Sequence, residues 1–168
     1  MKASNQQNEV YTVVLSAGLP ETMARLITAQ ATHETANFKS NVFLKTNNAF
    51  GMKVPRIRKT TFILKPSEIV RKSEGSTPYA QYSSVKNSVL DLINWLQYNR
   101  ADYTKLKNTV DYSTFLKTKG FYGASLEEYL SGLNRFFKNV TDLKQTVTIL
   151  PLVLIVALSI YFFTSYKN

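Results

Sequence analysis

Apolar residues recur at helical spacing in several separate stretches of this chain of 168 residues. The run Val10–Leu15 is predicted to lie on a first helix that ends near Gly18. Pro20 suits the first position of the next helix, which is predicted to continue to about Ala36. Residues 84–98 carry valines and leucines three or four positions apart, and this spacing predicts another helix. The pattern therefore favours a mainly helical fold.

Two more helices are predicted after residue 100, and the last one has the clearest start signal. Ser125 and Glu128 have the spacing of a capping box, in which each side chain accepts a hydrogen bond from the other residue's backbone N–H. An apolar stripe follows, made of Leu126, Tyr129, Leu130, Leu133, Phe137 and Val140. Residues 47–76 contain glycines, prolines and the β-favouring run TTFIL, which predicts loops and a short hairpin. The fold class is thus mainly α (α+β), with a small loop or β lobe.

The C-terminal end of the chain has a different composition. Residues 146–166 contain no charged side chain, and as a helix they reach roughly 30 Å, enough to cross the hydrocarbon core of a bilayer. Aromatic residues gather near the end of this stretch, as they do at membrane interfaces. We expect a domain at residues 1–140 and a single-pass transmembrane anchor at 141–168, which places the protein in a membrane. The alternative is a core helix or a subunit-interface helix.

Charge and composition narrow the classes of function. The chain has no cysteine and one histidine, which excludes thiolate chemistry and makes a zinc site improbable. Neither a metal nor a cofactor is expected. The net charge of +10 suits a polyanionic partner such as an anionic membrane or an acidic wall polymer. The lysines are scattered rather than clustered, so nucleic acid is not expected as a partner.

Glu34 lies in the middle of an apolar helical face. At about 100° per residue it falls within about 20° of Met23, on the same side as Leu26, Ile27 and Gln30. A carboxylate there costs several kcal/mol unless it is paired, protonated or lining a cleft. Desolvation raises a carboxyl pKa, and a raised pKa is what a general acid needs at neutral pH. The alternative is a buried glutamate that is held by a capping or packing hydrogen bond.

Three segments in order resemble the glucosaminidase domains of glycoside hydrolase family 73. The strongest resemblance lies in AQATHETANF and NNAFGMK, which begin at residues 29 and 47. The matching positions are Ala29, Gln30, Ala31, Glu34, Ser40, Asn47, Asn48, Phe50, Gly51, Met52 and Lys53. Similar segments follow at residues 82–91 and 116–133. Together the resemblance covers roughly residues 8–138.

This resemblance implies a lysozyme-like fold with a groove for peptidoglycan. Glu34 would protonate the leaving oxygen of the β-1,4 bond after N-acetylglucosamine. The second catalytic group would be Glu74 or Glu68 in the β lobe. Alternatively, the substrate's own N-acetyl group would attack, with Tyr122 polarising or positioning it. The residues expected to bind substrate are Gln30, Asn47, Asn48, Phe50, Gly51 and Tyr82. Trp95 and Tyr98 are expected in the core.

A wall hydrolase with a membrane anchor suggests a particular setting. The N-terminus lacks the apolar stretch of a signal peptide, so we hypothesise a virion protein of a membrane-containing bacteriophage that opens the host wall during entry. Two other functions remain open from the sequence. One is a catalytically inactive protein that binds peptidoglycan or has a structural role in the membrane, and the other is a lytic transglycosylase. The expected partners are peptidoglycan and a lipid membrane, and the sequence does not determine the oligomeric state.

Overall fold

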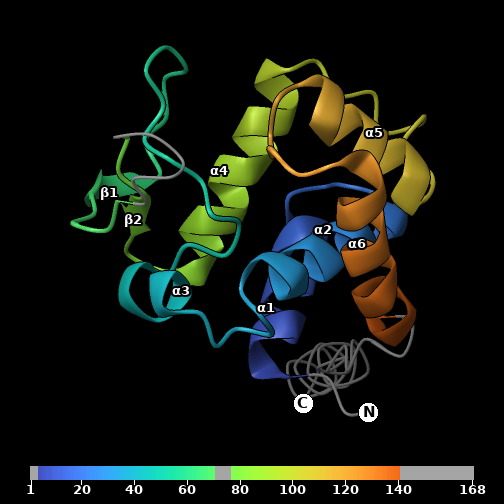
Figure 1. Cartoon of the computed structure of the whole chain (residues 1–168), viewed down its shortest axis with the longest axis horizontal. Coiled ribbons are helices and arrows are strands. Elements are labelled where there is room, and N and C mark those ends of the chain that lie inside the picture. The colour runs from blue at the N-terminus through green and yellow to red at the C-terminus, as the bar shows by residue number, and fades with distance from the viewer. Residues whose placement is uncertain (1–3, 71–76, 141–168) are drawn as a thin grey trace, which may run out of the picture.

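The structure is a computed structural model that describes residues 4–70 and 77–140. Within these ranges the chain forms six helices and two strands (Figure 1). The elements are α1 (Asn5–Ser16), α2 (Glu21–Glu34), α3 (Asn41–Thr46), β1 (Ile63–Pro66), β2 (Ala80–Tyr82), α4 (Val85–Tyr98), α5 (Thr109–Thr118) and α6 (Leu126–Val140). The predicted mainly helical fold with a small β lobe is confirmed.

The predicted transmembrane helix and its boundary at residue 140 lie outside the described residues. Of the helices within residues 4–70 and 77–140, none combines the length and the apolar character that a membrane crossing requires. The division of the chain into a domain and an anchor therefore stays a prediction.

Helix α2 is the centre of the helical part, with α1 and α6 packed against it. Its apolar face is buried completely at Met23, Leu26 and Ile27, and burial of each such side chain contributes about 1.5–3 kcal/mol. The helix ends two residues before the predicted end at Ala36. After the C-cap residue Thr35, residues 36–38 all have positive φ angles, which a right-handed helix cannot contain.

The β lobe lies beside α4, on the side away from α5 and α6 (Figure 1). Strands β1 and β2 pair antiparallel, with Ile63 opposite Tyr82. Strand β1 lies in the region 47–76 where a hairpin was predicted, but its partner β2 lies beyond that region, so the predicted hairpin is confirmed only for its first strand. Helix α3 was not predicted. Its N-cap Ser40 accepts a hydrogen bond from the backbone N–H of Phe43, and Asn47 ends it in the left-handed conformation.

Helix α6 begins as its capping box predicts. The Ser125 backbone N–H donates to the Glu128 carboxylate at 3.1 Å, and the Glu128 N–H donates to the Ser125 hydroxyl at 3.2 Å. Along the predicted stripe, Tyr129, Leu133 and Val140 are buried. The capping box thus identified the start of the helix, and the apolar periodicity identified its inward face.

Gly132 lies in the interior of α6, where glycine is unfavourable, and the reason is its contact with His33. A Cβ atom at Gly132 would lie 2.3 Å from Cε1 of the His33 ring. The same ring contacts Tyr129 edge-on, with centroids 5.2 Å apart. The absence of a side chain at Gly132 therefore lets α6 approach α2 closely.

We expect Gly132→Ala to destabilise the protein by about 1–3 kcal/mol, because the added methyl group overpacks this contact. Helix propensity alone predicts the opposite, a gain of about 1 kcal/mol. Urea denaturation measures the difference. Ser131→Ala, at the exposed neighbouring position, is the matched control and should change stability by no more than about 0.5 kcal/mol. A stabilised Gly132→Ala variant would contradict this packing.

Candidate active site

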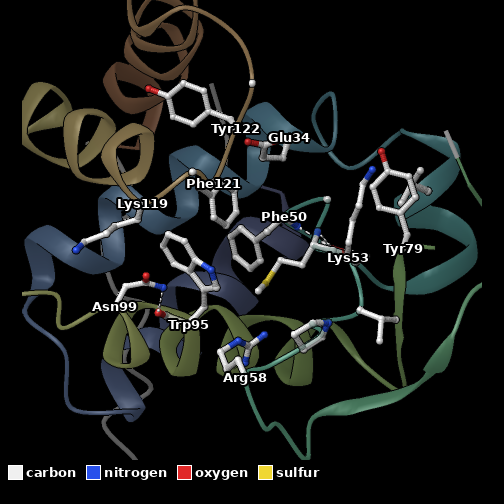
Figure 2. Close-up of a pocket in the computed structure, with 18 of the residues that line it drawn as sticks. Glu34, Phe50, Lys53, Arg58, Tyr79, Trp95, Asn99, Lys119, Phe121 and Tyr122 are labelled. Atoms are coloured by element: carbon white, nitrogen blue, oxygen red, sulfur yellow. Dashed lines mark hydrogen bonds between the residues drawn. The ribbon is translucent and has the colours of Figure 1, made fainter. Parts of the chain in front are cut away.

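Glu34 is the last residue of α2, and its half-buried side chain lines a cleft between the helices and the β lobe. This cleft has a volume of about 910 Å³, and its lining includes Glu34, Phe50, Gly51, Trp95 and Tyr122 (Figure 2). The Tyr129 hydroxyl donates to Glu34 Oε1 at 2.8 Å. Oε2 faces Gly51, and a Cβ atom there would lie 3.8 Å away. The carboxyl group thus has one oxygen held by α6 and one directed to the cleft wall.

The turn after Glu34 is strained and tightly held. The Thr35 hydroxyl donates to the Ala31 carbonyl at 2.6 Å and accepts from the Phe38 N–H at 2.8 Å. Residues 36–38 then form a left-handed turn, which costs roughly 1–2 kcal/mol per non-glycine residue. Such strain persists where surrounding contacts fix the backbone, and it is frequent at functional sites. Glu34 also sits at the C-terminal end of α2, where the helix dipole disfavours a negative side chain.

The loop 47–53 forms the cleft wall beside Glu34. Gly51 has a φ of +62°, a left-handed conformation that favours glycine. Asn48 is buried, and its side chain donates to the carbonyls of Met52 (2.7 Å) and Ala80 (2.9 Å) while accepting from the Met52 N–H (3.0 Å). Asn48 lines the cleft, but its amide is used in these hydrogen bonds, which hold the loop in shape, rather than in binding a sugar.

Three other residues expected to bind substrate have structural surroundings. The Asn47 amide donates to the Tyr82 carbonyl at 3.1 Å. The Tyr82 hydroxyl donates to Asp91 at 2.8 Å, and burial together with Asp91 raises the pKa of Tyr82 well above its usual range. Gln30 is fully buried. Gln30, Asn47 and Tyr82 are absent from the cleft lining, because packing and hydrogen bonds hold them in the core and at its edge.

Tyr122 lines the cleft with its ring, but its hydroxyl points elsewhere. The ring stacks on Tyr129, with centroids 3.7 Å apart and an interplanar angle of 6°. Its hydroxyl donates to the Ser113 carbonyl at 3.0 Å, away from Glu34 (Figure 2). The hydroxyl that reaches Glu34 belongs to Tyr129, whose pKa is raised by burial and by Glu34. Tyr129 therefore stays protonated at neutral pH and can act as a donor.

From the sequence, Tyr129 was expected in an apolar stripe, within the segment 116–133 that resembles the family, and no contact with Glu34 was predicted for it. The available signal was that a buried tyrosine needs a partner for its hydroxyl.

Of the two predicted second carboxylates, only one is among the described residues. Glu68 is exposed and does not line the cleft, and Glu74 lies outside the described residues. Across residues 4–70 and 77–140, Glu34 is the one carboxyl side chain on the cleft lining. The same ranges hold no cluster of histidine, aspartate or glutamate side chains suited to a metal ion.

Two residues that were expected in the core, Trp95 and Tyr98, line the far end of the cleft. Trp95 also packs against the core, whereas Tyr98 is exposed. Trp95, Tyr98 and Asn99, at the C-terminal end of α4, line the cleft, and Figure 2 shows Trp95 and Asn99 across from Glu34. The Trp95 ring meets Phe121 edge-on, with centroids 5.0 Å apart. Lys119 adds a positive charge at this end. Helical spacing assigned Trp95 to an inward face, but it could not show that this face borders a cleft.

Comparison with known proteins agrees with this geometry. A family model described as "Glucosaminidase: Mannosyl-glycoprotein endo-beta-N-acetylglucosaminidase" matches residues 19–142. No curated protein sequence matches the chain. The catalytic domain of the autolysin Auto from Listeria monocytogenes is similar in structure, with a TM-score of 0.53 and 20% identity over 84% of this chain and 88% of that one.

A chain from a type VI secretion system effector-immunity complex of Pseudomonas protegens is also similar. Its TM-score is 0.50, with 12% identity over 82% of this chain and 94% of that one. At these identities the two structures support the fold alone. The family model covers most of the chain and includes Glu34, the cleft and α6. This chain therefore belongs to the glucosaminidase family and is a glycoside hydrolase.

Proposed function

We propose that this protein is an endo-β-N-acetylglucosaminidase that cleaves the β-1,4 bond after N-acetylglucosamine in peptidoglycan, with Glu34 as the general acid. The observation that carries the proposal is the position of Glu34, a carboxyl group on a cleft wall with one oxygen bound by the Tyr129 hydroxyl. Family membership supports the glycosidase chemistry. The structural similarity to an autolysin favours peptidoglycan as the substrate.

The second catalytic group is the N-acetyl group of the substrate. Among the described residues that line the cleft, Glu34 is the one carboxyl side chain, and this favours a mechanism that needs no second carboxylate over one that uses Glu74, which lies outside those residues. The acetamido oxygen attacks its own C1 while the bond from C1 to the bridging oxygen breaks. The proton on Glu34 passes to that oxygen, so the next sugar departs as a neutral alcohol and an oxazolinium ion remains.

Glu34, now a carboxylate, then acts as the general base. It takes a proton from a water molecule whose oxygen attacks C1. The oxazolinium ring opens, which restores the acetamide and returns the proton to Glu34. The acetamido oxygen and then the water oxygen each attack C1 and each invert its configuration, so the configuration of the sugar is retained overall.

The rest of the cleft suits an acidic, N-acetylated glycan. Trp95 and Phe121 offer aromatic surface for sugar rings. Lys53 and Lys119 line the cleft from its two sides (Figure 2). Their charges complement the carboxylates on the lactyl and peptide groups of peptidoglycan, a property that a neutral chitin-like chain lacks.

Product analysis tests this function. Purified sacculi are digested, reduced with borohydride and analysed by mass spectrometry. The expected product carries a reduced N-acetylglucosamine at its new end. A 1,6-anhydro-muramic end would show transglycosylase chemistry and contradict the proposal. Binding to sacculi without release of reducing ends would support the inactive alternative.

We further propose that residues 146–166 anchor this domain to a membrane, as their uncharged sequence suggests. In expressing cells, the full chain should sediment with membranes and resist extraction by alkaline carbonate, while a chain ending at residue 140 should not. The bacteriophage setting requires in addition that the protein be found in the membrane of purified virions. Its absence from such particles would contradict that setting.

A further inference from the structure

The chain segment that joins α5 to α6 forms part of the cleft wall. Phe121, Tyr122 and Gly123 line the cleft together with Glu34, and Figure 2 shows the side chains of Phe121 and Tyr122 in this lining. Residues 121–124 belong to no helix or strand. The shape of this segment therefore depends on its contacts with neighbouring elements.

Lys117, in the last turn of α5, makes three of these contacts. Its ammonium group donates to the backbone carbonyl of Gly123 at 3.2 Å and to that of Ala124. It also lies 5.3 Å from the centroid of the Tyr122 ring, within the range of a cation–π interaction. One side chain thus holds three consecutive residues, through charge-assisted hydrogen bonds that are roughly twice as strong as neutral ones.

Side-chain packing contributes little to the second half of the segment. Gly123 and Ala124 are exposed. A Cβ atom at Gly123 would meet nothing within 4 Å apart from its chain neighbours. The hydrogen bonds from Lys117 are therefore the contacts that extend the attachment to α5 as far as residue 124.

The first half of the segment is attached both to α5 and to α6. The Phe121 N–H donates to the Leu116 carbonyl at 2.9 Å, and the Tyr122 hydroxyl donates to the Ser113 carbonyl at 3.0 Å. The Tyr122 ring stacks on Tyr129 of α6, with centroids 3.7 Å apart. These contacts place the two aromatic side chains, and the lysine ammonium secures the residues that follow them.

We propose that Lys117 is a positioning residue that keeps residues 121–124 in the shape of a preformed wall for the glycan. Lys117 does not line the cleft, so it acts through the segment rather than by touching the sugar. A wall that is already ordered lowers the entropic cost of binding, because the substrate does not have to order it. The inference rests on the proposed function, since it assumes that a glycan occupies this cleft.

Lys117→Met tests the proposal. The substitution keeps an unbranched apolar side chain but removes the ammonium group, so residues 122–124 lose all three contacts. On soluble peptidoglycan fragments we expect KM to rise by roughly 10-fold, because binding must now order the segment. We expect kcat to stay within about 2-fold of the wild-type value, since the ordering cost applies equally to the bound ground state and the transition state.

Three further variants separate positioning from a general effect on the fold or on charge. Lys117→Arg should restore KM, because a guanidinium group also donates to carbonyls and stacks on aromatic rings. Lys117→Gln keeps a neutral donor and should fall between the arginine and methionine variants, an order that can be measured even where Lys117→Met folds poorly. Lys107→Met removes the same charge at an exposed position away from the cleft, and its KM should equal that of the wild type.

Amide hydrogen exchange in the full chain follows the segment without any activity. The peptide that spans residues 117–125 should exchange faster in Lys117→Met than in the wild type, whereas peptides from α4 should not change. Wild-type protein that releases no reducing ends from sacculi would overturn the proposed function, and the exchange rates would still test the attachment. An unchanged KM or an unchanged exchange rate in folded Lys117→Met would overturn the inference. So would a Lys117→Arg variant that fails to restore KM.

Discussion

Glu34→Gln will lower kcat on peptidoglycan by about 10²–10⁴-fold, the usual contribution of a general acid. The amide keeps the size of the side chain and an oxygen that can accept from Tyr129, but it has no acidic proton to give to the leaving oxygen. Release of reducing ends from sacculi measures the rate, and thermal unfolding checks that the fold is intact.

Glu9→Gln is the matched control for this substitution. Glu9 is an exposed carboxyl group on α1 and does not line the cleft. The control should cleave peptidoglycan at the wild-type rate. A folded Glu34→Gln variant with activity close to that of the control would remove Glu34 from its proposed role.

Asp91→Asn will destabilise the protein by about 3–5 kcal/mol, because it leaves a buried arginine without its counter-charge. The Asp91 carboxylate is fully buried and accepts from Arg58 at 2.6 and 3.1 Å, from Thr60 at 2.6 Å and from Tyr82 at 2.8 Å. Arg58 and Thr60 lie in the loop before β1 and Asp91 lies on α4, so this network joins that loop to the helix. Arg58 also lines the cleft. Urea denaturation measures the loss of stability.

Asp102→Asn provides the comparison, since Asp102 forms an exposed ion pair with Lys105 at 3.5 Å. Solvent screens exposed pairs, so they contribute little to stability, and this variant should unfold close to the wild-type midpoint. A similarly small effect of Asp91→Asn would show that the buried network does not hold the β lobe. Activity should fall with stability in Asp91→Asn, because the same loop shapes the cleft.

The elements with strong local signals were predictable from the sequence. The helix predicted over residues 84–98 is observed at Val85–Tyr98, and the capping box gave the start of α6. The angular position of Glu34 among apolar neighbours singled out a carboxyl group that the structure places on a cleft. These predictions succeeded because each depends on residues that are close in the sequence.

Features that depend on tertiary contacts could not be predicted. Helix α3 has six residues, too short for a periodic pattern. The partners of Tyr129 and Gln30 lie 95 and 82 positions away in the sequence, so the direction of their polar groups is decided by packing. For the same reason, Trp95 was assigned to the core although it borders the cleft.

The most direct test of the central claim is the dependence of the rate on the leaving group. Dinitrophenolate departs from a sugar without needing a proton, so an enzyme that lacks only its general acid should still release it. We predict that Glu34→Gln and the wild type release dinitrophenol from a dinitrophenyl chito-oligosaccharide at similar rates in the first turnover, although the variant fails on peptidoglycan. Equal impairment of the variant on both substrates would contradict proton donation by Glu34.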